Sequence, residues 1–151
     1  MTEERKKELS ENYARVLEMI EAAKKTRGGD KPVTLLAATK TVPAEDICYL
    51  IENCGLKLCG ENHAQEFTDK YDAVRAAGAE MDFIGHLQTN KVKYIVGKAR
   101  LIHSLDSIKL AEEINSRAEK LGVEQKVLVE VNIGEEENKT GVNPGEVGEF
   151  L

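Results

Sequence analysis

The sequence contains no tryptophan and no long apolar run. Aromatic residues make up only 5% of its 151 residues, so few rings are available on which the bases of a single strand could stack. The formal charge is −6 and the basic residues form no stripe, which argues against binding to nucleic acid. No stretch is apolar over the length needed to span a bilayer. We therefore expect neither a nucleic acid nor a membrane among its partners.

Cysteine is also scarce. The three cysteines, Cys48, Cys54 and Cys59, lack the CxxC spacing typical of redox and zinc sites. The charged N-terminus does not resemble a signal peptide, and an odd number of cysteines without a secretion signal favours reduced thiols. We expect a cytoplasmic location, and we assign none of the cysteines a metal or catalytic role.

What the sequence does contain is a regular alternation of helical and strand patterns. An amphipathic helix is predicted over residues 4–25, with one apolar face formed by Leu9, Tyr13, Val16, Leu17 and Ile20. Five strand–helix units follow over 33–151, with strands ending near Thr39, Gly60, Gly85, His103 and Ile133. Strands that alternate with helices imply parallel pairing through right-handed crossovers. The predicted fold class is therefore α/β, with residues 1–151 in a single domain.

The number of units bears on the architecture. A (β/α)8 barrel has eight such units and about 250 residues. This sequence has five units and ends inside a helical pattern at Leu151. The alternatives are an open sheet and part of a barrel. We expect the second, a TIM-barrel type of domain with only five of its eight βα units present.

A lysine stands at the end of the first predicted strand. The apolar and β-branched run 33–39, between Pro32 and Pro43, predicts a buried strand, and Lys40 follows it directly. In α/β folds, ligands bind at the carboxyl ends of parallel strands. Partial burial there would favour the neutral, nucleophilic form of the Lys40 amine. The alternative is that Lys40 only marks the strand end and points into water.

Polar side chains follow the later strands as well. They include Glu61, Asn62, His63, His86, Gln88, Ser104, Asp106 and Asn132. In a parallel sheet these strand ends lie around one mouth. The sequence has no GxGxxG, GxxxxGK[ST], HExxH or GxSxG motif, and its three histidines lack clear carboxylate support for a metal. The remaining chemistry is that of an imine-forming lysine, with neutral hydrogen-bonding groups around a flat ligand.

Several segments, in order along nearly the whole chain, resemble the pyridoxal-phosphate homeostasis proteins, the YggS/PROSC family. These segments are Ala37–Pro43, Gly60–Asn62, Phe83–Lys93, Ile102–Asp106 and Val131–Gly141. The block Phe83–Lys91 is specific to that family. The resemblance implies a barrel like that of alanine racemase, standing alone, which binds pyridoxal 5′-phosphate (PLP) through a lysine at the end of its first strand.

The resemblance also assigns roles to residues. It implies that Lys40 forms a Schiff base with PLP, that Asn62 lies beside the cofactor, and that His86 lines the same mouth. Lys139 is a candidate secondary or transfer site, and the alternative is a solvated lysine in an acidic loop. His63 stands where tyrosine or arginine is common in the family, so we assign it no role.

The function implied by the resemblance is to hold PLP without turnover and to moderate its free concentration. PLP-dependent apo-enzymes are candidate recipients. One alternative is a PLP-dependent racemase or decarboxylase, which needs an acid–base residue, usually a tyrosine, on the opposite face of the cofactor. The four tyrosines all fall in helical patterns, which ranks that alternative second. A scaffold that binds a partner and no cofactor ranks third.

The resemblance further implies that the phosphate of PLP is bound after the seventh and eighth strands of the barrel. Those strands lie beyond the five units present. We therefore expect five units alone to bind PLP more weakly than a complete barrel. We also expect them to oligomerise through exposed strand edges.

Overall fold

The computed structural model describes residues 1–28, 31–134 and 140–151. Its helices and strands alternate along the chain, as the sequence predicts. In order they are α1 (Glu3–Arg27), β1 (Ala37–Ala38), α2 (Ala44–Tyr49), η1 (Leu50–Cys54), β2 (Leu58–Glu61), α3 (Ala64–Ala77), β3 (Glu80–Phe83), η2 (Thr89–Lys91), α4 (Val92–Ile95), β4 (Ile102–Leu105), α5 (Ile108–Leu121), β5 (Val127–Val129), η3 (Pro144–Glu146) and α6 (Val147–Phe150).

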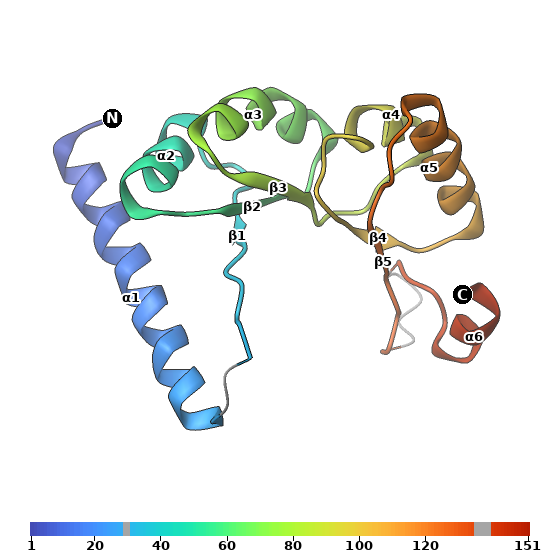
Figure 1. Cartoon of the computed structure of the whole chain (residues 1–151), viewed down its shortest axis with the longest axis horizontal. Helices are drawn as coiled ribbons and strands as arrows, with labels where there is room; N and C mark the ends of the chain where they lie inside the picture. Colours follow the sequence, from blue (N-terminus) through green and yellow to red (C-terminus); the bar gives the residue numbers. More distant parts are fainter. Residues whose placement is uncertain (29–30, 135–139) are drawn as a thin grey trace.

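The five strands form one parallel sheet, in the order β1-β2-β3-β4-β5. Each strand pairs with the next one along the chain, and β2 and β3 share the longest register, from Leu58↔Glu80 to Glu61↔Phe83. In Figure 1, α2, α3, α4 and α5 all lie on the same side of this sheet. The α/β class and the parallel pairing predicted from the sequence are thus confirmed.

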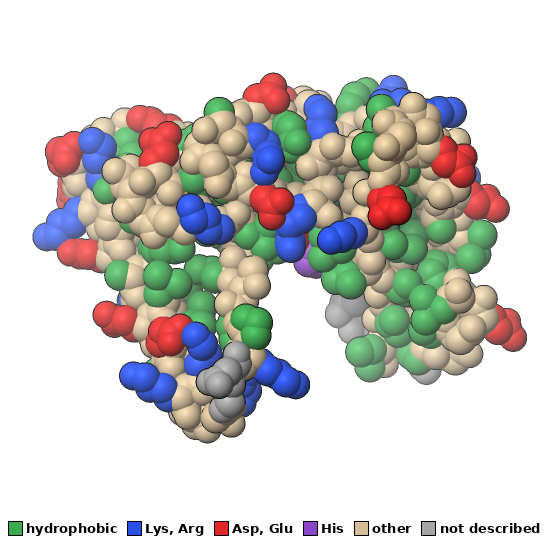
Figure 2. Space-filling model, in the orientation of Figure 1, with side chains coloured by type: hydrophobic (Ala, Val, Ile, Leu, Met, Phe, Trp, Pro, Cys, Tyr) green, Lys and Arg blue, Asp and Glu red, His purple; other side chains and the backbone are tan. Residues whose placement is uncertain are grey.

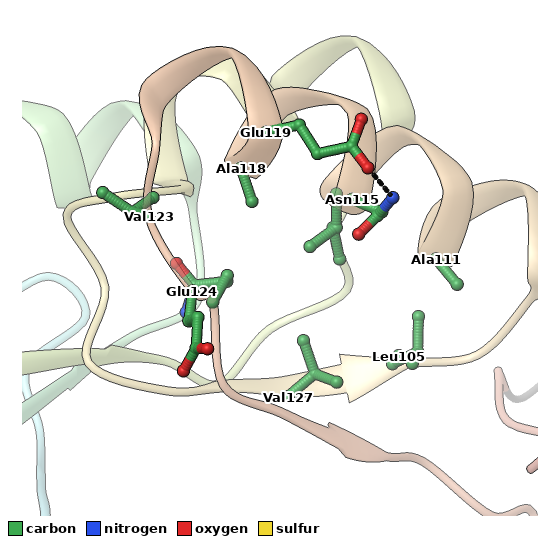
Figure 3. A pocket seen from close by; sticks show the side chains of 10 residues that line it. Leu105, Ala111, Asn115, Ala118, Glu119, Val123, Glu124 and Val127 are labelled. Carbon is green, nitrogen blue, oxygen red and sulfur yellow. Dashed lines mark hydrogen bonds between the residues drawn. The ribbon is translucent and has the colours of Figure 1, made fainter.

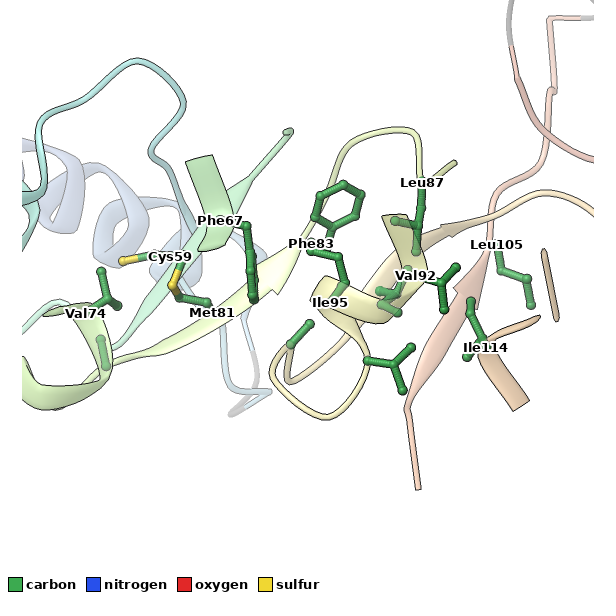
Figure 4. Packing of buried hydrophobic residues seen from close by; sticks show 14 of the residues in the cluster. Cys59, Phe67, Val74, Met81, Phe83, Leu87, Val92, Ile95, Leu105 and Ile114 are labelled. Carbon is green, nitrogen blue, oxygen red and sulfur yellow. The ribbon is translucent and has the colours of Figure 1, made fainter. Parts of the chain in front are cut away.

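The hydrophobic core fills the space between the sheet and this layer of helices. Successive side chains of a strand point to opposite faces, and Cys59, Met81 and Phe83 point toward the helices, where they are buried (Figure 4). Phe67 of α3 meets the Phe83 ring edge-on, with 6.3 Å between the ring centroids. Burying a large apolar side chain of this kind contributes about 1.5–3 kcal/mol, so this layer supplies most of the stability that burial can provide.

A buried carboxylate lies on the other face of the sheet. Asp82 is fully buried, and by strand alternation it points away from Met81 and Phe83. Its Oδ1 accepts a hydrogen bond from Arg100 Nε at 2.8 Å, and its Oδ2 accepts one from Arg100 Nη2 at 2.6 Å. His103 Nε2 lies 2.9 Å from the same Oδ2. These contacts tie β3 to β4 and compensate the cost of burying the charge.

The edges of the sheet differ from the sequence prediction. The predicted buried strand 33–39 is a strand only at Ala37–Ala38, and Val33 is 47% exposed. The prediction was wrong for 33–36 because this edge segment has β2 on one side only, and β2 begins at Leu58. The fifth strand, predicted to end near Ile133, is likewise shortened and covers only Val127–Val129.

The long helix α1 packs less closely than its apolar stripe suggests. It contains no buried residue, and Val16 and Leu17 are 38% and 39% exposed. Its N-terminal half is tied to α2 by an Arg5–Asp46 ion pair, whereas its other half projects past the sheet (Figure 1). Figure 2 shows hydrophobic side chains on this projecting half. Among the described residues, no helix has the length and apolarity required to cross a membrane.

We predict that Cys59 resists thiol reagents in the folded protein. Burial raises the pKa of Cys59 to about 12, so the reactive thiolate is scarce near neutral pH. A chromogenic disulfide reagent at about pH 8 is therefore expected to modify Cys54, more slowly Cys48, and Cys59 only after unfolding in urea. Reaction of all three thiols at one rate in the absence of urea would contradict this.

Candidate functional site

A cavity lies at the carboxyl ends of the first three strands. Its volume is about 630 Å³. Lys40 reaches it after β1, Asn62 after β2 and His86 after β3. Its other lining residues are His63, Ala64, Gln65, Phe83, Gly85, Leu87, Gln88 and Lys91. The structure therefore brings together the three residues that the sequence singles out.

A volume of about 630 Å³ falls within the range of roughly 300–1,000 Å³ that is usual for small-molecule sites.

The ends of the later strands do not line this cavity, although all five strand ends were expected around one mouth. Ser104 is buried, His103 pairs with Asp82, and Asn132 donates its backbone N–H to Val142 O at 3.0 Å. The cavity is thus built from the ends of β1, β2 and β3. Lys139 lies outside the described residues.

Lys40 is the primary amine at this cavity that the sequence predicts to be reactive. Its side chain is exposed, so the expected partial burial against apolar neighbours is not found. The reason is its place at the end of β1, the edge strand. Among the described residues, the Lys40 side chain has no hydrogen-bond or ion-pair partner. Its amine is therefore free to react with a ligand in the cavity.

The backbone on both sides of Lys40 is held in place by a buried ionic network. Lys70 of α3 donates hydrogen bonds to Thr39 O at 2.9 Å, to Glu61 Oε1 at 2.8 Å and to Glu66 Oε2 at 2.8 Å. The Thr39 hydroxyl donates to Glu61 Oε1 at 2.7 Å, and Thr41 N donates to Glu66 Oε2 at 2.8 Å. Glu61 is fully buried, so its charge depends on these donors.

The network changes the acidity of its members. Burial by itself lowers the pKa of Lys70, but the hydrogen bonds to Glu61 and Glu66 outweigh it and raise that pKa above its ordinary value. The hydrogen bonds from Lys70 and from Thr41 N lower the pKa of Glu66. Both shifts favour the charged forms of Lys70 and Glu66.

Asn62 and Gly85 lie in close backbone contact where β2 and β3 end. A Cβ atom added at Gly85 would lie about 2.1 Å from Asn62 O, far inside van der Waals contact. Ile84 N also donates to Glu61 O at 2.9 Å. Glycine at position 85 thus allows the two strand ends to approach, which sets the place of Asn62 at the cavity.

His86 is oriented by a carboxylate from the next strand end. Its Nδ1 lies 3.2 Å from Asp106 Oδ2, and its side chain is 50% exposed whereas that of Asp106 is 12% exposed. This contact gives Nδ1 a partner and leaves Nε2 for a ligand. The Asp106 carboxylate is not used to cap α5, because Ser107 caps that helix through a bond from Leu110 N to Ser107 Oγ at 3.3 Å.

Two polar residues of the cavity wall were given no role from the sequence. His63 was expected among the strand-end residues around the mouth but was assigned no role, and it lines the cavity at the start of α3. Lys91 supplies a second amine, and its Nζ lies 5.8 Å from the centre of the Tyr94 ring. Lys91 stands within the block Phe83–Lys93, and its position five residues after His86 was the available signal. Among the described residues, no cluster of His, Cys, Asp and Glu could hold a metal ion.

A second cavity lies apart from these residues, between α5 and the strands β4 and β5. Its volume is about 330 Å³. Figure 3 shows apolar side chains, including Leu105, Ala118 and Val127, around it, with an Asn115–Glu119 hydrogen bond of 2.9 Å at one side. It contains no lysine, so it does not offer the imine chemistry of the first cavity.

Comparison with known proteins places these residues in context. No protein-family model matches the chain. A curated relative from Aquifex aeolicus is 52% identical over 142 residues, which are 93% of this chain and 62% of the relative. Its counterpart in Escherichia coli K12 is 34% identical over 148 residues, again 62% of that protein. Both are named pyridoxal phosphate homeostasis protein.

This chain is a homologue of the pyridoxal phosphate homeostasis proteins. The resemblance inferred from the sequence is thereby confirmed. The chain spans about 62% of the length of these two relatives.

Solved structures agree with this relationship. An unknown protein from Bifidobacterium adolescentis matches with a TM-score of 0.90 and 34% identity, over 99% of this chain and 65% of that one. PipY of Synechococcus elongatus matches with 28% identity, over 60% of its length in both of its forms. The TM-score is 0.74 without PLP, over 89% of this chain, and 0.68 with PLP bound, over 83%.

We predict that Gly85→Ala destabilises the protein. The added Cβ would collide with Asn62 O, and overpacking of this kind usually costs about 1–3 kcal/mol. Urea denaturation measures the loss. Gly148→Ala is the matched control, because a Cβ there meets nothing within 4 Å. Equal stability of the two variants would show that the β2–β3 approach does not require glycine.

We also predict that Glu66→Gln lowers the free energy of unfolding at neutral pH but not at acidic pH. A carboxylate whose folded pKa is lowered adds stability above its unfolded pKa, and this stability is lost as the pH falls through the folded value. The urea midpoints of wild type and variant are therefore expected to differ at about pH 7 and to converge toward about pH 3. Glu113→Gln, at an exposed position of α5, is the control. A constant difference across this range would contradict the prediction.

Proposed function

We propose that the chain binds PLP in the cavity at the ends of β1, β2 and β3, and that it holds PLP as a Schiff base on Lys40 without turnover. The observation that carries this proposal is the meeting of Lys40, Asn62 and His86 at one cavity. It is supported by the names of the homologues and by the PLP-bound form of PipY.

The side chains at the cavity fit the chemistry of an aldehyde ligand. Lys40 would hold such a ligand, because its neutral amine can form a C=N bond with an aldehyde carbon while the carbonyl oxygen is lost as water. The ammonium form of Lys40 must first release a proton, and its exposure to solvent provides the route. The Asn62 amide can donate or accept a hydrogen bond, and His86 presents Nε2 because Nδ1 faces Asp106.

We propose further that the sheet is an arc of a (β/α)8 barrel of the alanine racemase type, within a single domain over 1–151. Two features support this. The strand order follows the chain without reversal, and α2 to α5 lie on one side. A doubly wound sheet would reverse its strand order and carry helices on both faces. A site at the carboxyl ends of the strands is also typical of such barrels.

A carrier fits the cavity better than a racemase or decarboxylase does. None of the four tyrosines, Tyr13, Tyr49, Tyr71 and Tyr94, is among the residues that line it. The described wall thus offers no tyrosine as the second acid–base group.

We propose PLP-dependent apo-enzymes as recipients of the bound PLP. We also propose the cytoplasm as the location, which fits three free cysteines.

Titration with PLP followed by borohydride reduction tests this function. Peptide mapping of the 151-residue chain is expected to place the pyridoxyl group on Lys40. Lys40→Arg should lower the visible Schiff-base absorbance by at least about tenfold, because a guanidinium does not form an imine. Lys93→Arg, which changes an exposed lysine that does not line the cavity, should leave it unchanged. Labelling scattered over many lysines would refute the proposed site.

A further inference from the structure

We infer that Lys70 is a positioning residue for Lys40: through Glu61 and Glu66 it fixes the turn Thr39–Thr41, so that the Lys40 amine enters the cavity in one direction. This inference rests on the proposed function. Lys70 is not among the residues that line the cavity, so any effect it has on PLP must pass through the backbone that carries Lys40.

The hydrogen-bonding capacity of Lys70 is fully used. An ammonium group has three N–H donors, and Lys70 Nζ has three acceptors within 2.9 Å, which are Thr39 O, Glu61 Oε1 and Glu66 Oε2. Side-chain contacts of this number fix the position of the nitrogen. Lys70 therefore links α3 to the end of β1 through a side chain whose position is fixed.

The two peptide groups that flank Lys40 are both connected to Lys70, one directly and one through Glu66. The peptide before Lys40 is held at its carbonyl, because Thr39 O accepts directly from Lys70. The peptide after Lys40 is held at its N–H, because Thr41 N donates to Glu66 Oε2, the atom that Lys70 also binds. With both peptide planes anchored, the direction of the Lys40 Cα–Cβ bond is set by the network.

The turn would not keep this shape without such anchors. Thr41 has a φ of 63°, and it is the one non-glycine residue with a positive φ in the described part of the chain. A β-branched residue is strained there, at a cost of order 1–3 kcal/mol. Such strain persists where surrounding contacts over-determine the backbone. The bond from Thr41 N to Glu66 is one of those contacts.

Loss of Lys70 would also set two carboxylates against each other. Glu61 Oε1 and Glu66 Oε2 both lie 2.8 Å from Lys70 Nζ. Glu61 is fully buried, and its Oε2 has no hydrogen-bond partner in the described structure. Without the ammonium between them the two groups repel, and the turn that they hold would open.

The test compares Lys70→Met with Arg100→Met in the same chain. Arg100→Met also breaks a buried ion pair, with Asp82, but Arg100 makes no contact with the turn and does not line the cavity. After addition of PLP, three quantities are measured on folded protein: the initial rate of Schiff-base formation, the induced circular dichroism of its visible band, and the share of reduced pyridoxyl on Lys40.

For Lys70→Met we expect the rate to fall by roughly tenfold, a scale known for misplaced reacting groups. We also expect the induced dichroism to disappear and the label to spread to other lysines. For Arg100→Met we expect lower stability but a rate, dichroism and Lys40 share like those of wild type. Circular dichroism of the bound chromophore reports its fixed orientation, which a loss of stability alone does not change in the folded fraction.

The outcomes separate this inference from the proposed function. If wild type does not label Lys40, the proposed function fails, and the inference fails with it. If wild type labels Lys40 and Lys70→Met behaves alike, or if Arg100→Met loses as much as Lys70→Met, only the inference is overturned. Should Lys70→Met not fold, Glu66→Gln decides: a smaller Lys40 share supports the inference, and an unchanged share overturns it.

Discussion

Parallel pairing of β2 with β3 is the constraint on which the rest of this structure depends. Its four register pairs, from Leu58↔Glu80 to Glu61↔Phe83, place Phe83 beneath α3 and bring the two strand ends to one level. Because both strands run the same way, Asn62 and Gly85 emerge side by side. The cavity is thus a product of register, and a slip of one residue would turn each of these side chains to the opposite face.

The sheet carries a buried carboxylate on each of its faces. Glu61 lies on the helix side, where Lys70 of α3 neutralises it, and Asp82 lies on the other side with Arg100 and His103. Each carboxylate links elements that apolar packing alone would leave free to slide: one ties β1 and β2 to α3, and the other ties β3 to β4. Buried ion pairs of this kind contribute more to a unique arrangement than to net stability.

The sequence could predict the elements and the residues of the cavity because both depend on local patterns. Apolar runs and helical patterns located the strands and helices, although the two edge strands were predicted too long. Polar residues after strands pointed to Lys40, Asn62 and His86. The Lys70 network could not be predicted in this way. Its Glu66 contact joins residues four apart on one helix, but Glu61 and Thr39 lie 9 and 31 residues from Lys70. The apolar stripe of α1 suggested closer packing than the structure shows, for a related reason. Periodicity identifies which face of a helix is apolar, but it does not identify what packs against that face.

The exposure of the Lys40 side chain bears on how long a ligand stays bound rather than on how tightly it binds. A Schiff base on an exposed amine is open to attack by water, so hydrolysis returns the aldehyde by the path along which it arrived. An enclosed lysine would keep its ligand until a lid moved, whereas an exposed lysine on a firmly held turn captures and releases with no conformational step. If Lys40 holds PLP as proposed, residence of the ligand is governed by chemical exchange at a single bond, which suits the proposed reservoir better than a catalyst.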